Sequence, residues 1–95
     1  VYFTVGLAYY NQAVNKELAM NGKNAKERKT ARMEMKKLYE QSLPYLEKYR
    51  KMAPEQQNKW LTPLYNIYLN LNMGKEFDEI IKIRHERENT KETGH

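Results

Sequence analysis

The fold is decided by residues 2–24, which read YFTVGLAYYNQAVNKELAMNGKN. Up to about residue 20, apolar side chains recur every three or four residues in two neighbouring stripes, the spacing of a helix buried on a wide face. Asn21-Gly22-Lys23-Asn24 then supplies a stop, with Gly22 free to take a positive φ. Asn24 is placed as the N-cap of a second helix, and Glu27 three residues later completes a capping box. This stretch predicts a tight helical hairpin.

Composition favours one small domain of long helices. The chain has 95 residues, of which 40% are hydrophobic and 12% aromatic, with only four Gly and three Pro to form turns. Because there is no Cys, neither disulfides nor thiolate metal sites can hold it together. No apolar run approaches the roughly 20 residues that span a bilayer, so we expect a soluble domain without a membrane span.

The first residues suggest a piece of a longer protein. The chain begins at Val1, without Met and within an apolar helical pattern. It also lacks the basic start and cleavage site of a signal peptide. Any export signal would lie upstream, so the compartment stays open.

The second helix is predicted from about Ala25 to Met52, with core positions at helical spacing. Pro44 lies inside it, where the missing amide should bend the helix near residues 40–44. The expected core positions are Ala31, Met35, Leu38, Ser42, Tyr45, Leu46, Tyr49 and Met52.

A second hairpin is predicted after Ala53-Pro54. Its first helix covers residues 57–73, and Thr62-Pro63 is either an N-cap with a first-turn proline or a second kink. After a break at Gly74, a short amphipathic helix includes Phe77 and Ile80. We therefore expect one helical domain over residues 1–88, with hairpins at 2–53 and 55–88, and a disordered tail at 89–95.

Two stretches of the chain share one framework. Tyr2-x-x-Val5-Gly6-x-x-Tyr9 places an aromatic, an apolar residue, a glycine and a tyrosine, and Trp60-x-x-Pro63-Leu64-x-x-Ile67 repeats it with Leu64 at the glycine position. Two more segments carry recognisable patterns. The first has a small residue, two apolar residues and a closing proline, and the second has a glycine, an aromatic residue and acidic residues in a turn. They are Ser42-x-x-x-Leu46-x-x-Tyr49-x-x-x-x-Pro54 and Gly74-Lys75-Glu76-Phe77-Asp78-Glu79-Ile80-Ile81.

In this order, the four segments resemble the helix signatures of the tetratricopeptide repeat (TPR) family, over about residues 2–83. The resemblance implies an all-α fold of about four helices in antiparallel hairpins, as a fragment of a right-handed solenoid. The alternative is an unrelated antiparallel helical bundle. The closing segment resembles the C-terminal part of an array.

The departure from the family is length, because the first unit exceeds the 34-residue repeat by about 24 residues. In this family the glycine of the first helix faces the small residue of the second, which would set Gly6 against Ser42. Their midpoint is residue 24, where the turn is predicted independently. The hairpin is therefore expected to be longer by about three turns, roughly 18 Å, with Ala13 near Met35 and Tyr10 near Leu38.

The resemblance implies a non-catalytic scaffold that binds a peptide or helix of a partner protein, whose identity stays open. Carried over by position, the partner-binding residues are Tyr10, Asn11, Asn58, Leu61, Tyr65 and Leu69, with Phe3, Leu7 and Tyr68 on the same face. Some of these are expected to be packing residues instead. The lysine and asparagine clamp of some family members is absent, so we expect no grip on a C-terminal carboxylate. An aromatic, amide-bearing groove suits an extended peptide or a helix.

No set of residues indicates catalysis. The chain has one Asp and two His, and its Glu residues are scattered along solvated faces. His85 and His95 have no partner at metal-ligand spacing, so we expect solvated histidines, no metal and no cofactor. Tyr2, Tyr9, Tyr45, Tyr49 and Tyr68 are expected to pack in the core.

An alternative function, binding of nucleic acid or an anionic surface, is suggested by the distribution of charge. The net charge is +5, and residues 23–51 hold ten Lys or Arg against four Glu. Such a segment could contact nucleic acid or an anionic surface, although interleaved Glu residues favour an ordinary solvated face. Its candidate residues are Lys26, Arg28, Lys29, Arg32, Lys36 and Lys37.

A repeat array usually needs three or more units for stability. One and a half to two units therefore predict either further repeats before Val1 or self-association.

Overall fold

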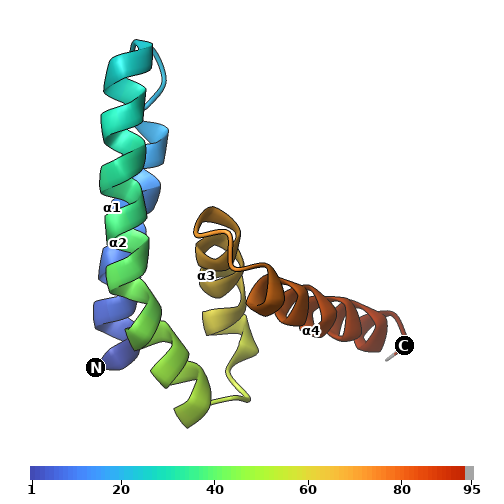
Figure 1. The fold of residues 1–95 in the computed structure, drawn as a ribbon. Coiled ribbons are helices and arrows are strands. Elements are labelled where there is room, and N and C mark those ends of the chain that lie inside the picture. The colour runs from blue at the N-terminus through green and yellow to red at the C-terminus, as the bar shows by residue number, and fades with distance from the viewer. Residues whose placement is uncertain (94–95) are drawn as a thin grey trace.

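The computed structural model describes the backbone of residues 1–93 and the side chains of residues 1–88. Within that part it contains the four helices α1 (Tyr2–Leu18), α2 (Ala25–Met52), α3 (Gln57–Asn70) and α4 (Gly74–Thr93) (Figure 1). The all-α prediction is confirmed. α4 continues to Thr93, so it is longer than the short helix predicted after Gly74 and includes residues 89–93 of the predicted tail. The prediction for His95 lies outside the described residues.

The turn between α1 and α2 forms where the sequence places it. Gly22 has a φ of 83°, a conformation open to glycine because it lacks a Cβ. The Asn24 side chain accepts a hydrogen bond from the Glu27 amide at 2.9 Å. The N-cap thus satisfies one of the free amides in the first turn of α2.

The register of this hairpin is also confirmed. The Ser42 hydroxyl donates to the Gly6 carbonyl at 2.6 Å, and both residues are buried. A Cβ at Gly6 would lie 2.8 Å from Leu46 Cγ, so a larger residue cannot enter without displacing that side chain. Tyr10 meets the ring of Tyr39, at 6.0 Å between centroids. The ring contact is thus with the residue after Leu38, the predicted neighbour of Tyr10.

Both internal prolines lie within continuous helices. α2 runs through Pro44 and α3 through Pro63. Figure 1 shows the last part of α2 slanting away from its long upper part, as a proline bend predicts. α3 begins at Gln57, so Pro63 is not the first residue of a late-starting helix.

The turn between α3 and α4 differs from the prediction. α3 ends at Asn70 rather than at residue 73, and the positive φ of 56° belongs to Asn72, not to Gly74. The Met73 amide donates to the Tyr68 carbonyl at 2.9 Å, and the Asn72 amide to that of Leu69 at 3.3 Å. This pair of bonds is a Schellman motif, in which asparagine replaces the usual glycine.

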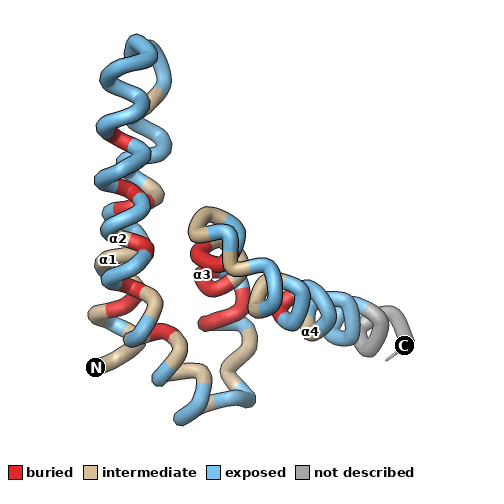
Figure 2. Tube along the Cα trace, in the orientation of Figure 1, coloured by how far each residue is buried: buried red, intermediate tan, exposed pale blue. Residues whose placement is uncertain are grey.

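The core lies where α3 packs between α2 and α4, and α3 contributes about half of it (Figure 2). Its buried cluster comprises Ala13, Met35, Tyr39, Leu46, Trp60, Leu61, Leu64, Ile67, Tyr68 and Ile80. Trp60 closes the base of the core by donating its indole N–H to the Ala53 carbonyl at 3.2 Å. Arg50 of α2 lies over the Trp60 ring and also forms an ion pair with Glu79 of α4 at 2.7 Å.

The set of buried tyrosines differs from the prediction. Of the five expected in the core, only Tyr68 is buried, while Tyr2, Tyr9, Tyr45 and Tyr49 are half-buried along the hairpin. Tyr39, which the predicted stripe omits, is 1% exposed. The cause is that α3 covers only one side of the hairpin. Apolar side chains on the other side of α1 and α2 have no further helix over them and stay half-buried.

Candidate functional site

The candidate site is the face on which α1 and α3 lie side by side. The Asn66 side-chain amide donates to the Tyr10 hydroxyl at 2.6 Å, and the Lys59 ammonium lies 5.8 Å from the centre of the Phe3 ring. Both contacts join residues 56 positions apart (66 − 10 and 59 − 3), so the two helices run parallel and in step. We call the surface that α1 and α3 form together the first-helix face, because each is the first helix of its hairpin.

The predicted partner-binding residues differ in how far they reach the surface. Asn11 and Asn58 are exposed, and Leu69 is 49% exposed. Tyr10 and Tyr65 are half-buried. These five residues can be reached by a bound segment.

Two members of the predicted face belong to the core. Leu61 is 7% exposed. Tyr68 is 1% exposed, and its hydroxyl donates to the Glu47 carboxylate at 2.9 Å. Burial, followed by the nearby Glu47, raises the pKa of Tyr68 above its usual value. A side chain held in this way packs α3 against α2 and is not available to a partner.

A small hollow of about 180 Å³ opens beside Tyr65, lined by Leu61, Thr62, Tyr65, Asn66 and Arg84. The Arg84 guanidinium lies 5.2 Å from the centre of the Tyr65 ring, which also packs against Phe77 at 5.1 Å. Arg84 has an ion pair with Glu88 at 3.5 Å. Tyr65 is therefore held in place by α4 while one side stays accessible.

Sequence reasoning missed Asn66 and Arg84. Asn66 adjoins the predicted Tyr65, but no spacing rule indicates which neighbour meets α1. Arg84 comes from another helix, and its position depends on how α4 packs. A second hollow of about 210 Å³ lies beside Leu69 and is lined by Tyr68, Leu69, Asn72, Met73, Gly74 and Phe77.

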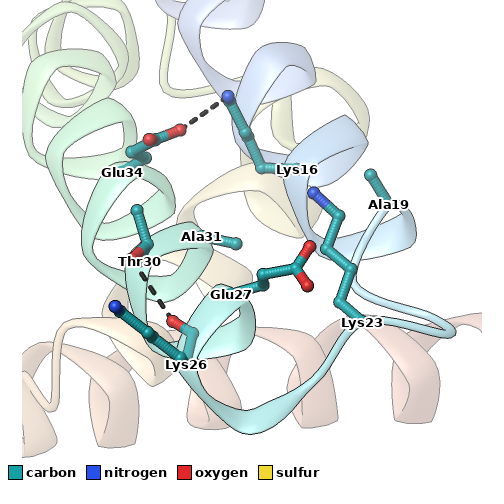
Figure 3. A pocket seen from close by; sticks show the side chains of 8 residues that line it. All are labelled: Lys16, Ala19, Lys23, Lys26, Glu27, Thr30, Ala31 and Glu34. Carbon is teal, nitrogen blue, oxygen red and sulfur yellow. Dashed lines mark hydrogen bonds and ion pairs between the residues drawn. The ribbon is translucent and has the colours of Figure 1, made fainter.

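The six basic residues predicted as an alternative contact for nucleic acid or an anionic surface are all exposed along α2. Within the described residues none of them forms an ion pair. Across the hairpin, the Lys16 ammonium meets the Glu34 carboxylate at 2.6 Å and lowers the pKa of that carboxyl. Figure 3 shows the hollow around this pair, of about 330 Å³. Its lining consists of Lys16, Ala19, Lys23, Lys26, Glu27, Thr30, Ala31 and Glu34.

Few titratable groups of the described part have a strongly altered environment. Burial raises the pKa of Tyr39 to about 12, with Glu17 as a smaller cause. No three His, Cys, Asp or Glu side chains among the described residues gather in a way that could hold a metal ion. Within the same residues, no helix combines the length and apolar character needed to cross a membrane.

Comparison of the chain with protein-family models, with curated proteins and with solved structures gives no match.

Proposed function

We propose that this chain is a non-catalytic interaction module of TPR type, which binds a peptide or helix of a partner protein on its first-helix face. The observation that carries the proposal is the parallel pairing of α1 and α3 through Asn66 and Tyr10. Two first helices in step form one continuous surface, and a bound segment can contact both. The partner's identity stays open.

The register of the hairpin supports the TPR type. Gly6 and Ser42, at the two small positions of the family signature, meet at 2.6 Å across the hairpin. The close approach of the helices requires a glycine there, because a Cβ would clash with Leu46. The added turns lie beyond this contact, toward Asn24.

The side chains of the face suit a peptide. The exposed amides of Asn11 and Asn58 can pair with a peptide backbone, which needs both donors and acceptors. The half-buried rings of Tyr10 and Tyr65 offer apolar area at a small loss of side-chain entropy. Residues 57–73 hold no carboxylate, and Lys59 is their only charge.

A display selection tests the proposal. The chain is immobilised, peptides are selected from a random library, and the dissociation constants of the selected peptides are measured by calorimetry. Tyr65→Ala and Asn11→Ala should each weaken binding by roughly 5- to 30-fold, as truncation of an anchoring residue does at interfaces. Gln12→Ala is the matched control, because this exposed amide is the next residue on α1 and points to another side of the helix.

The melting temperature of each variant is measured alongside. If Tyr65→Ala unfolds the domain, the residue belongs to the core, and Asn11→Ala then decides the matter. Selected peptides that bind equally well to the Asn11 and Gln12 variants would place the binding surface elsewhere.

A further inference from the structure

The far end of the first hairpin stands clear of the other helices. Because α1 and α3 are parallel with an offset of 56 residues, Asn70 at the end of α3 is level with Val14 on α1. Everything beyond that level is made by α1, the turn and α2 alone, as Figure 1 shows. In the register of Gly6 and Ser42, Glu34 lies opposite Val14. We call residues 14–37, which include the next turn of α2, the projecting end.

The projecting end is strongly basic. It holds eight Lys or Arg against three Glu. Only Lys16 among these cations forms an ion pair in the described part of the chain. The other seven are Lys23, Lys26, Arg28, Lys29, Arg32, Lys36 and Lys37.

Three of these cations form a stripe along α2. Arg28, Arg32 and Lys36 recur at every fourth residue and so lie on one side of α2, over a length of about 12 Å. Glu27 and Glu34 lie on another side, where both line the hollow in Figure 3. Glu40 occupies the next position along the stripe and lines a hollow with Lys36 and Glu34. The positive charge without a carboxylate three or four residues away on α2 therefore lies at Arg28 and Arg32.

The chemistry around the stripe favours a protein over a nucleic acid. Leu18 and Met33 are 66% and 65% exposed on the projecting end, and such apolar side chains gain from contact with other apolar side chains rather than with phosphates. Residues 14–37 contain no aromatic residue on which a base could stack.

We propose that the projecting end is a second docking surface, which binds a helix of a partner protein with carboxylates at every fourth residue beside apolar residues. The spacing matches because side chains four residues apart on the partner helix are separated by the same rise of about 6 Å. Charge complementarity selects such a helix and speeds its association. This surface is separate from the first-helix face, so the two proposals can fail independently.

The probe is a labelled synthetic helical peptide with Glu at every fourth position and Leu beside it, and binding to the chain is measured by fluorescence anisotropy. The triple variant Arg28→Glu, Arg32→Glu, Lys36→Glu should weaken binding at least about 10-fold, because three favourable pairs become repulsive. The control variant is Lys51→Glu, Lys75→Glu, Lys82→Glu, which changes the net charge equally at exposed cations outside the projecting end. It should alter the affinity by less than about 2-fold, because screening weakens distant charges.

A charge-swapped peptide, with Lys in place of Glu, should bind the stripe variant more tightly than it binds the native chain. Circular dichroism checks that the stripe variant is folded, and the milder Arg32→Gln, Lys36→Gln replaces it if it is not. The proposal is overturned by any of three results. They are no binding of the acidic peptide even at low salt, an equal loss in the control variant, or tighter binding of duplex or single-stranded RNA or DNA that the stripe variant abolishes.

Discussion

The two ends of the first hairpin are built from the same pair of helices but are stabilised differently. At the hairpin base, residues 2–13 and 38–52, the helices are covered by α3, and Tyr39 and Leu46 are at most 1% exposed. On the projecting end, Ala31 and Met35 are the only buried residues, and residues 21–30 are all exposed (Figure 2). A helix pair keeps its form over both ends, but only one end has a third helix to pack against.

The two ends differ in the interactions that stabilise them. Burial of apolar side chains holds the base, and each large one contributes about 1.5 to 3 kcal/mol. The projecting end depends on local terms, namely the Asn24 cap, the Gly22 turn and the Lys16–Glu34 ion pair. Substitutions of surface residues there should therefore have little effect on the fold.

The largest effect is expected for Leu46→Ala at the base. Leu46 is 0% exposed, so its loss leaves a cavity and should lower the free energy of unfolding by about 2 to 5 kcal/mol. The control is Met33→Ala on the projecting end, which is 65% exposed and should change it by less than about 0.5 kcal/mol. Urea denaturation measures both. Equal effects would mean that the two ends are packed alike.

Gly6→Leu should be the next largest. The new Cβ alone would lie 2.8 Å from Leu46 Cγ, and overpacking of this kind costs about 1 to 3 kcal/mol. Gly74→Leu is the matched control, because nothing lies within 4 Å of a Cβ there and its φ is not positive. Thermal unfolding compares the two, and an unchanged melting temperature for Gly6→Leu would refute the register of Gly6 and Ser42.

Alkaline pH should destabilise the base. The folded chain raises the pKa of Tyr39 from 10.0 to about 12, so between these pH values the unfolded chain loses a proton that the folded chain keeps. Stability contributed by neutral Tyr39 is complete below pH 10 and is lost as the pH rises toward 12, on the order of 2 kcal/mol. Tyr39→Phe keeps the ring and should reduce this loss in denaturation curves measured at pH 9, 10, 11 and 12. The rest of the loss comes from buried Tyr68, whose pKa is also raised. A parallel decline in both proteins would contradict the assignment.

The smallest effect is expected at the cap of the projecting end. Asn24→Ala removes the acceptor for the Glu27 amide and should cost about 1 kcal/mol. Asn21→Ala serves as the control, because Asn21 is exposed in the same turn and its side chain makes no hydrogen bond in the described structure. Hydrogen exchange of the α2 amides should show the loosening of the first turns in the Asn24 variant, while exchange at the base stays unchanged.

Much of the hairpin could be predicted from the sequence, because its signals act over a few residues. The turn at Gly22 and the Asn24 cap are local, and the small pair Gly6 and Ser42 sets the register by close approach. The prediction for the turn between α3 and α4 is less accurate, because Asn72 rather than Gly74 adopts the positive φ. Asparagine tolerates this conformation more readily than other side chains, but a nearby glycine is the stronger signal in a sequence.

The candidate site was predictable only in part. Periodicity places Asn11, Asn58 and Tyr65 on first helices, but it does not say which side of each helix a third helix covers. Leu61 and Tyr68 have the same periodicity but are buried. Arg84 reaches the Tyr65 ring from α4, the second helix of its hairpin.

The four helices, the first turn and the pairing of α1 with α2 could therefore be predicted from the sequence. Periodicity and capping depend on residues close in the chain, and the tight turn then fixes which residues of α1 and α2 meet. The contact of α1 with α3 through Tyr10 and Asn66, the choice of buried tyrosines and the absence of a third helix beside most of residues 14–37 could not be predicted in this way. These features depend on the angle and offset at which separate helices pack, and many side chains from all four helices set that geometry together.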